Sequence, residues 1–277
     1  MTIKRANGAQ DPILGAPVPH PAAGTDLTPM LHSDSYGSEG GSDQPCEAAF
    51  AAIAAAPTDR PFVVAQLGQS LDGRIATLSG HSRYINRFAA LEHLHRLRAH
   101  VDAVVVGVGT VVADDPQLTV RRVKGRSPAR VIIDANGRLP QDAKCLVDDG
   151  VARIVLRATS RPVPPGVQEI LVATAADGGL CPRSIVETLF AAGYRRLLIE
   201  GGARTISIFL QHGAVDRLHV LVAPMIIGSG VPGIELPPIA VVDDALRPVT
   251  RVHLLADGDV LFDCDLRLAV SGESEHV

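Results

Sequence analysis

Short aliphatic runs that recur along the chain constrain its fold more than any other feature. Val, Ile, Leu and Ala dominate residues 103–107, 130–134, 153–157, 196–200 and 218–224, and a similar run occupies 62–67. Apolar runs without alternation are typical of strands that are buried on both faces of a sheet. Amphipathic stretches follow several of these runs, and strands that alternate with helices form a largely parallel sheet. The sequence therefore predicts an α/β fold with helices on both faces of the sheet.

The composition supports this fold class and narrows the choice of ligand. Hydrophobic residues make up 46% of the chain, only 3% of residues are aromatic and Trp is absent, so the core must be aliphatic. Such a core favours α/β over a β-sandwich. With a formal net charge of −4, the chain lacks the basic surface that general nucleic-acid or acidic-membrane binding requires. We expect a small-molecule partner, and neither nucleic acid nor membrane.

The two ends of the chain differ in composition from its middle. Residues 1 to about 45 are rich in Gly, Pro, Ser and Asp, and they offer too little apolar surface to offset the entropy of ordering. A short helix is predicted for Cys46–Ala56, and Pro57 ends it. We therefore expect a mostly disordered tail at 1–58, a folded domain at 59–268 and a second tail at 269–277. A hairpin is predicted at the end of the domain, from 250–255 and 259–266.

Export and metal binding are not indicated. The N-terminus lacks the apolar core of a signal peptide, and no stretch approaches the roughly 20 apolar residues of a membrane helix. Cys-x-x-Cys spacing is absent, so no disulfide framework or zinc site is signalled by Cys46, Cys145, Cys181 and Cys264. We expect a cytoplasmic protein without a bound metal.

Three histidines fall within the helix that is predicted near residues 86–100. Leu91, Leu94 and Leu97 share one face of this helix. The same stretch contains His93, His95 and His100. No Cys pair or suitably spaced carboxylate stands near them, so we interpret the histidines as part of a solvated helix face rather than as metal ligands.

Glycines follow two of the predicted strands directly before a helix, namely Gly107 and Gly109 in the first segment and Gly201 and Gly202 in the second. In an open α/β sheet, ligands gather outside the carboxyl ends of the strands. A glycine there lets the backbone approach a phosphate, and a helix N-terminus offers free N–H groups. The two segments point to a nucleotide. Neither is a full dinucleotide fingerprint, and each glycine pair alone could be a tight turn.

A second candidate site consists of Ser82, Arg98 and Arg121. Arginines make bidentate contacts to phosphate and a serine hydroxyl adds a hydrogen bond, so these residues could hold one substrate phosphate. From spacing alone, three separate solvated surface residues are the favoured interpretation. A further acidic residue, Asp72, is interpreted as part of a turn with Gly73.

A family resemblance rests on the segments SLDGRIA, SGHSRYI, RLRAHVDAVVVGVGTVVADDPQLTVR, ARVIID and LLIEGGA. In order and spacing they resemble the reductase domain of the bacterial bifunctional riboflavin-biosynthesis deaminase/reductase, and also the stand-alone archaeal and fungal pyrimidine reductases. The resemblance extends from about Pro61 to Leu266. The His-x-Glu and Pro-Cys-x-x-Cys signature of the deaminase domain is absent from the sequence.

The resemblance implies a dihydrofolate-reductase-like fold with a mixed, mostly parallel sheet, bound NADPH and a homodimer. The implied reaction is the NADPH-dependent reduction of 5-amino-6-(5-phosphoribosylamino)uracil to its ribitylamino product. The positions that the resemblance assigns to substrate are Ser82, Arg98, Leu118, Arg121 and Glu200, with Glu200 as the candidate catalytic residue. The resemblance also assigns positions to the cofactor, and the glycines after the strand at 103–107 are added to them. The full set is Gly68, Tyr84, Gly107, Gly109, Thr110, Asp114, Gly201, Gly202, Ala203, Arg204 and Thr205.

Three positions depart from the pattern of the resembling family. Tyr84 stands where bacterial members commonly have Trp. Ala135 replaces a Ser or Thr after the strand at 130–134, which makes Asn136 the candidate to supply a cofactor hydrogen bond in its place. Gln66 replaces a Lys of the bacterial bifunctional members and is therefore a candidate contact to the pyrimidine. Candidates for the cofactor 2′-phosphate are Arg157, Thr159, Ser160 and Arg161.

Three alternatives to this reaction stay open from sequence. The first is reduction of the undeaminated 2,5-diamino-6-ribosylamino-pyrimidinone 5′-phosphate. The second is reduction of a dihydropterin or dihydrofolate, which has no phosphate for Arg98 and Arg121. The third is a nucleotide-binding module without catalysis, in which Ser82 and Glu200 would have no purpose.

Overall fold

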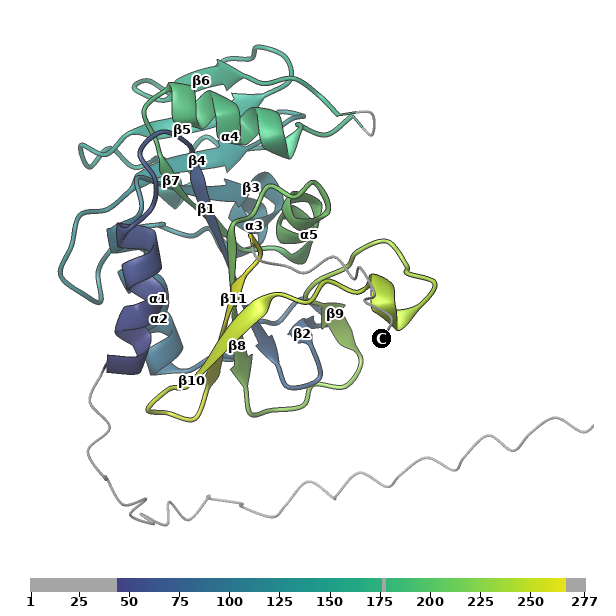
Figure 1. Cartoon of the computed structure of the whole chain (residues 1–277). Coiled ribbons are helices and arrows are strands. Elements are labelled where there is room, and N and C mark those ends of the chain that lie inside the picture. The colour runs from purple at the N-terminus through teal and green to yellow at the C-terminus, as the bar shows by residue number, and fades with distance from the viewer. Residues whose placement is uncertain (1–43, 176–177, 268–277) are drawn as a thin grey trace, which may run out of the picture. The chain divides into compact units, whose positions relative to one another are not determined.

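The computed structural model describes residues 44–175 and 178–267, with side chains from Glu47 onward. In this part of the chain, nine strands form one sheet in the order β10-β11-β8-β1-β7-β3-β4-β5-β6. All neighbours from β8 to β6 are parallel, whereas β11 is antiparallel to both β8 and β10. The predicted mixed, mostly parallel sheet with a C-terminal hairpin is thus confirmed (Figure 1).

The predicted strands agree closely with those of the structure. The strands are β1 (Phe62–Ser70), β2 (Arg74–Thr77), β3 (Ala103–Gly107), β4 (Ala129–Ile133), β5 (Arg153–Arg157), β6 (Gln168–Leu171), β7 (Arg196–Glu200), β8 (Arg217–Ala223), β9 (Gly230–Pro232), β10 (Val249–Leu254) and β11 (Val260–Asp265). Sequence analysis missed β2, β6 and β9, which are short and partly exposed. β2 and β9 pair with each other in a separate two-stranded sheet.

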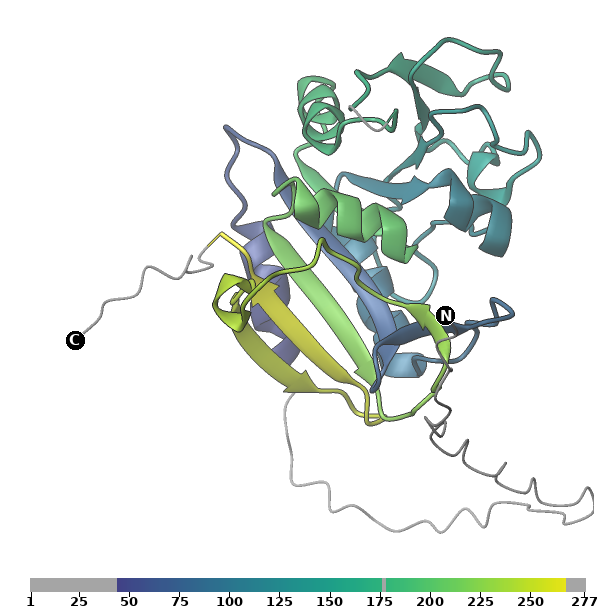
Figure 2. The same cartoon turned by 90° about the vertical axis from the view of Figure 1, so that its right-hand side faces the viewer.

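Helices cover both faces of the large sheet. The helices are α1 (Gln44–Ala54), α2 (Phe88–His100), α3 (Val108–Asp114), α4 (Pro182–Ala191) and α5 (Ala203–Gln211), and short 3-10 turns occupy Lys144–Leu146 and Val242–Asp244. One aliphatic core joins α4 and α5 to the sheet, and a second joins α1, α2 and α3 to the opposite face. Figure 2 looks onto the face that α5 covers. None of the helices in the described part is long and apolar enough to cross a membrane.

The helix predicted for Cys46–Ala56 is present as α1, and it packs into the core. Phe50 and Ile53 are buried against Leu97 of α2 and Phe62 of β1. The described residues from Gln44 onward belong to one compact unit, so the folded part of the chain begins before the boundary expected near residue 59. The folded part begins this early because α1 buries two large apolar side chains. The tails expected at 1–43 and 269–277 lie outside the described residues.

Asp72 ties two loops together, as its interpretation as a turn residue implies. Its carboxylate accepts hydrogen bonds from the Ser70 hydroxyl at 2.6 Å and from the backbone N–H groups of Ile227 and Gly228 at 3.1 and 2.7 Å. The hydrogen bond from Ser70 is the main reason why the pKa of Asp72 is lowered to about 2. Asp72 therefore joins the β1–β2 turn to the segment after β8.

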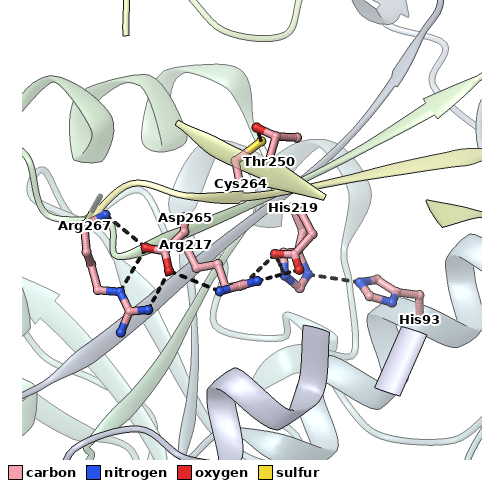
Figure 3. Close-up of polar contacts among 8 residues, drawn as sticks. His93, Arg217, His219, Thr250, Cys264, Asp265 and Arg267 are labelled. Atoms are coloured by element: carbon pink, nitrogen blue, oxygen red, sulfur yellow. Dashed lines mark hydrogen bonds and ion pairs between the residues drawn. The ribbon is translucent and has the colours of Figure 1, made fainter. Parts of the chain in front are cut away.

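A buried polar network runs between α2 and the C-terminal strands (Figure 3). Arg217 pairs with Asp263 through two contacts of 2.5 Å, and Asp263 lies 3.2 Å from His219 Nε2. His219 Nδ1 is in turn 3.1 Å from His93 Nε2 on α2. Burial would raise the pKa of Asp263, but His219 and Arg217 hold it well below its usual range. At the other end, Asp265 pairs with Arg267 at 2.6 Å.

We expect acid to destabilise the protein through His93. Burial, followed by His219 and Arg96, holds the pKa of His93 well below its ordinary value. The unfolded chain therefore binds more protons than the folded protein below pH 6.5, and stability is lost as the pH falls. For one such histidine the loss is at most about 2 kcal/mol at pH 5.

Urea unfolding at about pH 7.5 and pH 5 measures this effect in the wild type, in His93→Gln and in His81→Gln. Glutamine keeps a polar group near the position of Nε2 but does not titrate. His81 is exposed and serves as the matched control. His93→Gln should show a weaker pH dependence than the other two proteins. If the stability of His93→Gln depends on pH as strongly as that of the wild type, the assignment of the acid sensitivity to His93 is refuted.

Candidate active site

A cavity of about 820 Å³ lies where β1, β7, β3 and β4 reach their carboxyl ends. This is the place where open α/β sheets bind ligands. Gln66 comes from β1, Glu200 from β7, Gly107 from β3 and Ile133 from β4. Because these strands are neighbours, their ends together form the floor of one cavity rather than several small sites.

The two predicted glycine turns meet in this cavity. Gly202 N donates a hydrogen bond to the Thr110 hydroxyl at 3.0 Å. Gly201 has a φ of 88°, and a Cβ atom there would lie 2.8 Å from Thr110 Oγ1. A Cβ atom at Gly107 would lie 2.5 Å from Thr205 Oγ1. The turns therefore need glycine for their close approach, and both place bare backbone beside the N-terminal ends of α3 and α5.

A buried ion pair stands at one end of the cavity. Glu200 accepts two hydrogen bonds from Arg98, from Nε to Oε1 and from Nη2 to Oε2, both at 2.6 Å. Both side chains are almost fully buried. Burial alone would lower the pKa of Arg98, but the Glu200 carboxylate reverses this effect and raises it. A carboxylate bound in this way still has lone pairs that can accept hydrogen bonds from ligand N–H and O–H groups.

Gln66 lies beside Glu200 on the neighbouring strand. The two residues are register partners in the parallel pair of β1 and β7, so their side chains lie on the same face of the sheet. Gln66 lines the cavity, and its amide forms no hydrogen bond with any residue of the described part. Gln66 and Glu200 thus present an amide and a carboxylate side by side to a ligand.

Most of the predicted site residues line the cavity. They are Gln66, Gly68, Ser82, Gly107, Gly109, Thr110, Asp114, Leu118, Glu200, Gly201, Gly202, Arg204 and Thr205. Four others lie elsewhere. Arg98 is behind Glu200, Ala203 is buried in the core, Arg121 is exposed, and Tyr84 is 85% exposed with a φ of 67°.

The guanidinium group of Arg98 is committed to the protein itself. In addition to its two contacts with Glu200, Nη1 donates to the Thr119 carbonyl at 3.0 Å. Arg98 does not line the cavity. In this geometry it orients Glu200 and cannot join Ser82 as part of a phosphate site without giving up the buried carboxylate.

Two of the side chains expected to hold the cofactor 2′-phosphate, Arg157 and Ser160, are also engaged internally. Arg157 lies 3.1 Å from the Glu169 carboxylate and 3.6 Å from that of Asp134. Glu169 also accepts hydrogen bonds from the Ser160 hydroxyl at 2.5 Å and from Arg161 N at 2.9 Å. This loop does not line the cavity. Glu169 thus occupies the place in which an anionic ligand would have to bind.

Sequence analysis named Asn136 as a candidate cofactor contact, but it missed Arg138 on the same loop after β4 and the cavity residues of α4. Asn136 and Arg138 follow β4, whereas Leu180, Pro182 and Ile185 belong to α4 or precede it. Arg138 could have been found by the rule that identified the glycines, because it too follows the carboxyl end of a predicted strand. The apolar residues of α4 carry no local signal of this kind.

The interpretation of the α2 histidines as a solvated face is wrong for two of them. His93 and His95 are 3% and 2% exposed. Both have polar partners, which are His219 for His93 and the backbone N–H of Arg121 for His95. Hydrogen bonding explains why polar side chains can occupy this face. Among the described residues, no group of His, Cys, Asp or Glu is arranged to hold a metal ion.

The sequence of the chain matches the model of the RibD C-terminal domain over residues 61–256. The chain belongs to this family. The protein of Aquifex aeolicus named riboflavin biosynthesis protein RibD is 36% identical over 174 residues, which are 62% of this chain and 49% of that protein. The chain thus spans about half the length of this RibD relative.

A shorter relative is matched over most of its length. The protein of Methanothermobacter thermautotrophicus named 2,5-diamino-6-ribosylamino-4(3H)-pyrimidinone 5′-phosphate reductase is 37% identical over 177 residues, which are 61% of this chain and 81% of that protein. Among solved structures, a Thermotoga maritima deaminase/5-amino-6-(5-phosphoribosylamino)uracil reductase superposes with a TM-score of 0.65 at 29% identity. The match covers 75% of this chain and 57% of that one. Sequence and fold therefore agree on the RibD C-terminal domain.

We expect Arg98→Met to destabilise the protein by about 3 to 5 kcal/mol, because it leaves the buried Glu200 carboxylate without its partner. Adding Glu200→Gln should recover much of this loss, since the uncompensated charge is then gone. Urea unfolding of both variants and of Glu200→Gln alone measures the coupling. A double variant that is no more stable than Arg98→Met would show that the pair is not coupled in this way.

Proposed function

We propose that this protein is an NADPH-dependent reductase that converts a phosphoribosylamino-pyrimidine into its ribitylamino product in riboflavin biosynthesis. The observation that supports this most strongly is the cavity itself, which combines the paired Glu200, the free amide of Gln66 and two facing glycine turns. The names of the archaeal and Thermotoga relatives support the same reaction. A regulatory module without catalysis would not require this arrangement.

The substrate binds, in our proposal, at the end of the cavity that contains Gln66, Ser82 and Glu200. Glu200 accepts hydrogen bonds from the ribose hydroxyls or the pyrimidine, and Arg98 keeps its carboxylate in place. Ser82 and Arg121 bind the phosphate. Leu67, Leu94 and Leu118 line the same cavity and exclude water from the reacting carbon.

The glycine turns fit a dinucleotide phosphate group. The first N–H groups of a helix have no partner within the helix, so α5 offers donors next to Gly201 and Gly202. A side chain at Gly107 or Gly201 would collide with Thr205 or Thr110, which keeps the backbone of both turns accessible. When bound, NADPH supplies the hydride. The residues of the chain hold the ribose carbon C1′ in position to receive it.

Two arginines at the cavity are free to bind cofactor phosphates. Arg138 and Arg204 line it, and neither guanidinium group has an ion pair or hydrogen bond within the described part of the chain. Arg204 stands in the first turn of α5 and suits the pyrophosphate. Arg138 follows β4, three strand spacings or about 14 Å from β1, and suits the 2′-phosphate at the far end of the cofactor.

Gln66 is the residue that we expect to set the preference between the two pyrimidine substrates. Its amide can donate to an oxo group or accept from an amino group, whereas the lysine of bacterial members can only donate. We therefore propose that the protein accepts the uracil and its diamino precursor with little discrimination. The free amide of Gln66 supports a role in ligand recognition rather than in holding a neighbouring backbone group.

We also propose a homodimer in the cytoplasm. β10 is an edge strand of the sheet, and Val249, Val252 and Leu254 on it are 52%, 59% and 77% exposed. An exposed apolar edge strand is suited to pairing with a second chain. The molar mass in solution tests this proposal. A value near 29.1 kDa, the mass of one chain, would contradict it.

The first experiment follows NADPH oxidation with the uracil substrate, its diamino precursor and dihydrofolate. We expect turnover of both pyrimidines and none of dihydrofolate, which lacks the phosphate. The two kcat/KM values should differ by less than the roughly 5- to 150-fold that one unpaired polar group would cause. Gln66→Lys should shift the preference toward the uracil. Failure to reduce either pyrimidine would refute the proposed function, and an unshifted Gln66→Lys variant would refute the role of Gln66.

A second experiment concerns the choice between NADPH and NADH. Arg138→Ala should weaken NADPH binding roughly 10- to 150-fold, the effect of one charge-assisted contact, and leave NADH binding almost unchanged. Arg204→Ala is the matched control, because the pyrophosphate is common to both cofactors and both should bind more weakly. Titration calorimetry measures the four dissociation constants. Equal weakening of NADPH and NADH by Arg138→Ala would exclude its assignment to the 2′-phosphate.

A further inference from the structure

The loop between α3 and β4 is held in place by side chains rather than by regular structure. It has no helix or strand from residue 115 to 128. Leu118, which lines the cavity, adopts a left-handed φ of 56°. Such a conformation is unfavourable for a leucine and persists only where the surroundings impose it. Leu118 is itself 1% exposed, and the residues that follow it are bound by side chains.

Three backbone groups after Leu118 are bound by side chains. The Thr119 carbonyl accepts a hydrogen bond from Arg98 Nη1 at 3.0 Å. Val120 N donates to the Ser127 hydroxyl at 3.0 Å. Arg121 N donates to His95 Nδ1 at 3.1 Å. Arg98 and His95 both belong to α2, so this helix fixes the loop on either side of Val120.

We propose that His95 is a positioning residue for recognition of the substrate phosphate. Its imidazole holds the backbone of Arg121 and thereby sets the direction from which the Arg121 guanidinium approaches the phosphate. The inference rests on the proposed function, since it takes Arg121 as a phosphate ligand. It assigns a role to a histidine that touches neither substrate nor cofactor.

The electrostatic surroundings keep His95 suited to this role. To accept a hydrogen bond at Nδ1, the ring must be neutral with its proton on Nε2. Burial, followed by Arg98, Arg121 and Arg122, lowers the pKa of His95 to about 4, although a hydrogen bond with the Thr119 backbone acts in the opposite direction. The neutral ring avoids adding a positive charge among three arginines. The acceptor is thus present at every pH at which the protein is expected to work.

The guanidinium of Arg121 is close enough to the cavity for its charge to act on a ligand there. Burial, Arg98 and Arg122 lower the pKa of Arg121, and Glu200 raises it, so its guanidinium lies within the field of the carboxylate that lines the cavity. The side chain has one protein contact, from Nη1 to the Thr119 hydroxyl at 3.4 Å, among the described residues. Most of its donors are therefore available to a ligand, and the position of its backbone decides where they point.

The test uses ribose 5-phosphate as a probe, with binding measured by calorimetry, and the KM of the phosphorylated substrate. His95→Leu keeps an apolar side chain but removes the acceptor, and we expect both constants to rise roughly 5- to 100-fold. The kcat and the dissociation constant of NADPH should stay unchanged. His95→Asn should retain most of the affinity, because its amide oxygen can accept near the position of Nδ1.

The decisive comparison is made in an Arg121→Ala background. If His95 acts through Arg121, His95→Leu should have little further effect there. A full effect of His95→Leu in that background, or equal losses for NADPH and ribose 5-phosphate, would overturn the proposal. Where His95→Leu does not fold, His95→Gln replaces it, because its longer side chain carries the amide past the Nδ1 position. Equal affinity of His95→Gln and His95→Asn would then overturn the proposal.

These outcomes are separable from those of the proposed reaction. A wild-type protein that binds ribose 5-phosphate but reduces neither pyrimidine would refute the reaction and leave the role of His95 to be decided by the variants. A wild-type protein that does not bind ribose 5-phosphate would overturn the phosphate assignment of Arg121 and the role of His95 with it.

Discussion

The ion pair between Arg98 and Glu200 links the three parts of the molecule on which the site depends. Glu200 ends β7 at the floor of the cavity, and a buried carboxylate is tolerated only with a partner. Arg98, on α2, donates two hydrogen bonds to Glu200 and a third to the Thr119 carbonyl in the loop after α3. The orientation of α2, the end of β7 and the backbone near Leu118 are therefore not independent of one another. Removing the charge at either end changes all three.

The same face of the sheet carries a line of polar residues that extends well beyond the cavity. Register places Asp263, His219, Gln66 and Glu200 side by side on β11, β8, β1 and β7. Each buried member except Gln66 has a partner, and α2 provides His93 for His219 as it provides Arg98 for Glu200. Among the described residues, the Gln66 amide has no hydrogen-bond partner, and Gln66 lines the cavity. The helix thus satisfies a polar row in which one position remains open to the cavity.

Features that depend on residues close together in the sequence could be predicted, whereas features that depend on distant residues could not. The strands at 103–107 and 196–200 are set by local apolar runs, and both were predicted to the residue. Gly107 and Gly201 were found because a glycine at a strand end has a local meaning. The burial of His93 and His95 was missed, since their partners come from β8 and from Arg121, which are distant in sequence. No periodicity in α2 reveals that a histidine at this face will meet an acceptor or donor there.

The loop after β5 shows how a charge pattern in the sequence can differ from the charges that the fold leaves available to a ligand. Arg157, Ser160 and Arg161 resemble an anion site, but Glu169 on β6 is an anion supplied by the protein. It binds the side chains of Arg157 and Ser160 and the backbone N–H of Arg161. A second anion bound there would have to displace this carboxylate or accept its repulsion. The loop after β4 has no such carboxylate facing its free arginine, because Asp134 is turned toward its own backbone and accepts from Arg138 N and Leu139 N. Among the described residues, Arg138 lines this side of the cavity with a guanidinium group that has no partner, on the loop next to the one that the sequence favoured. The replacement of a hydroxyl by Ala135 is compatible with this shift, since a guanidinium can bind a phosphate without the help of a neighbouring hydroxyl.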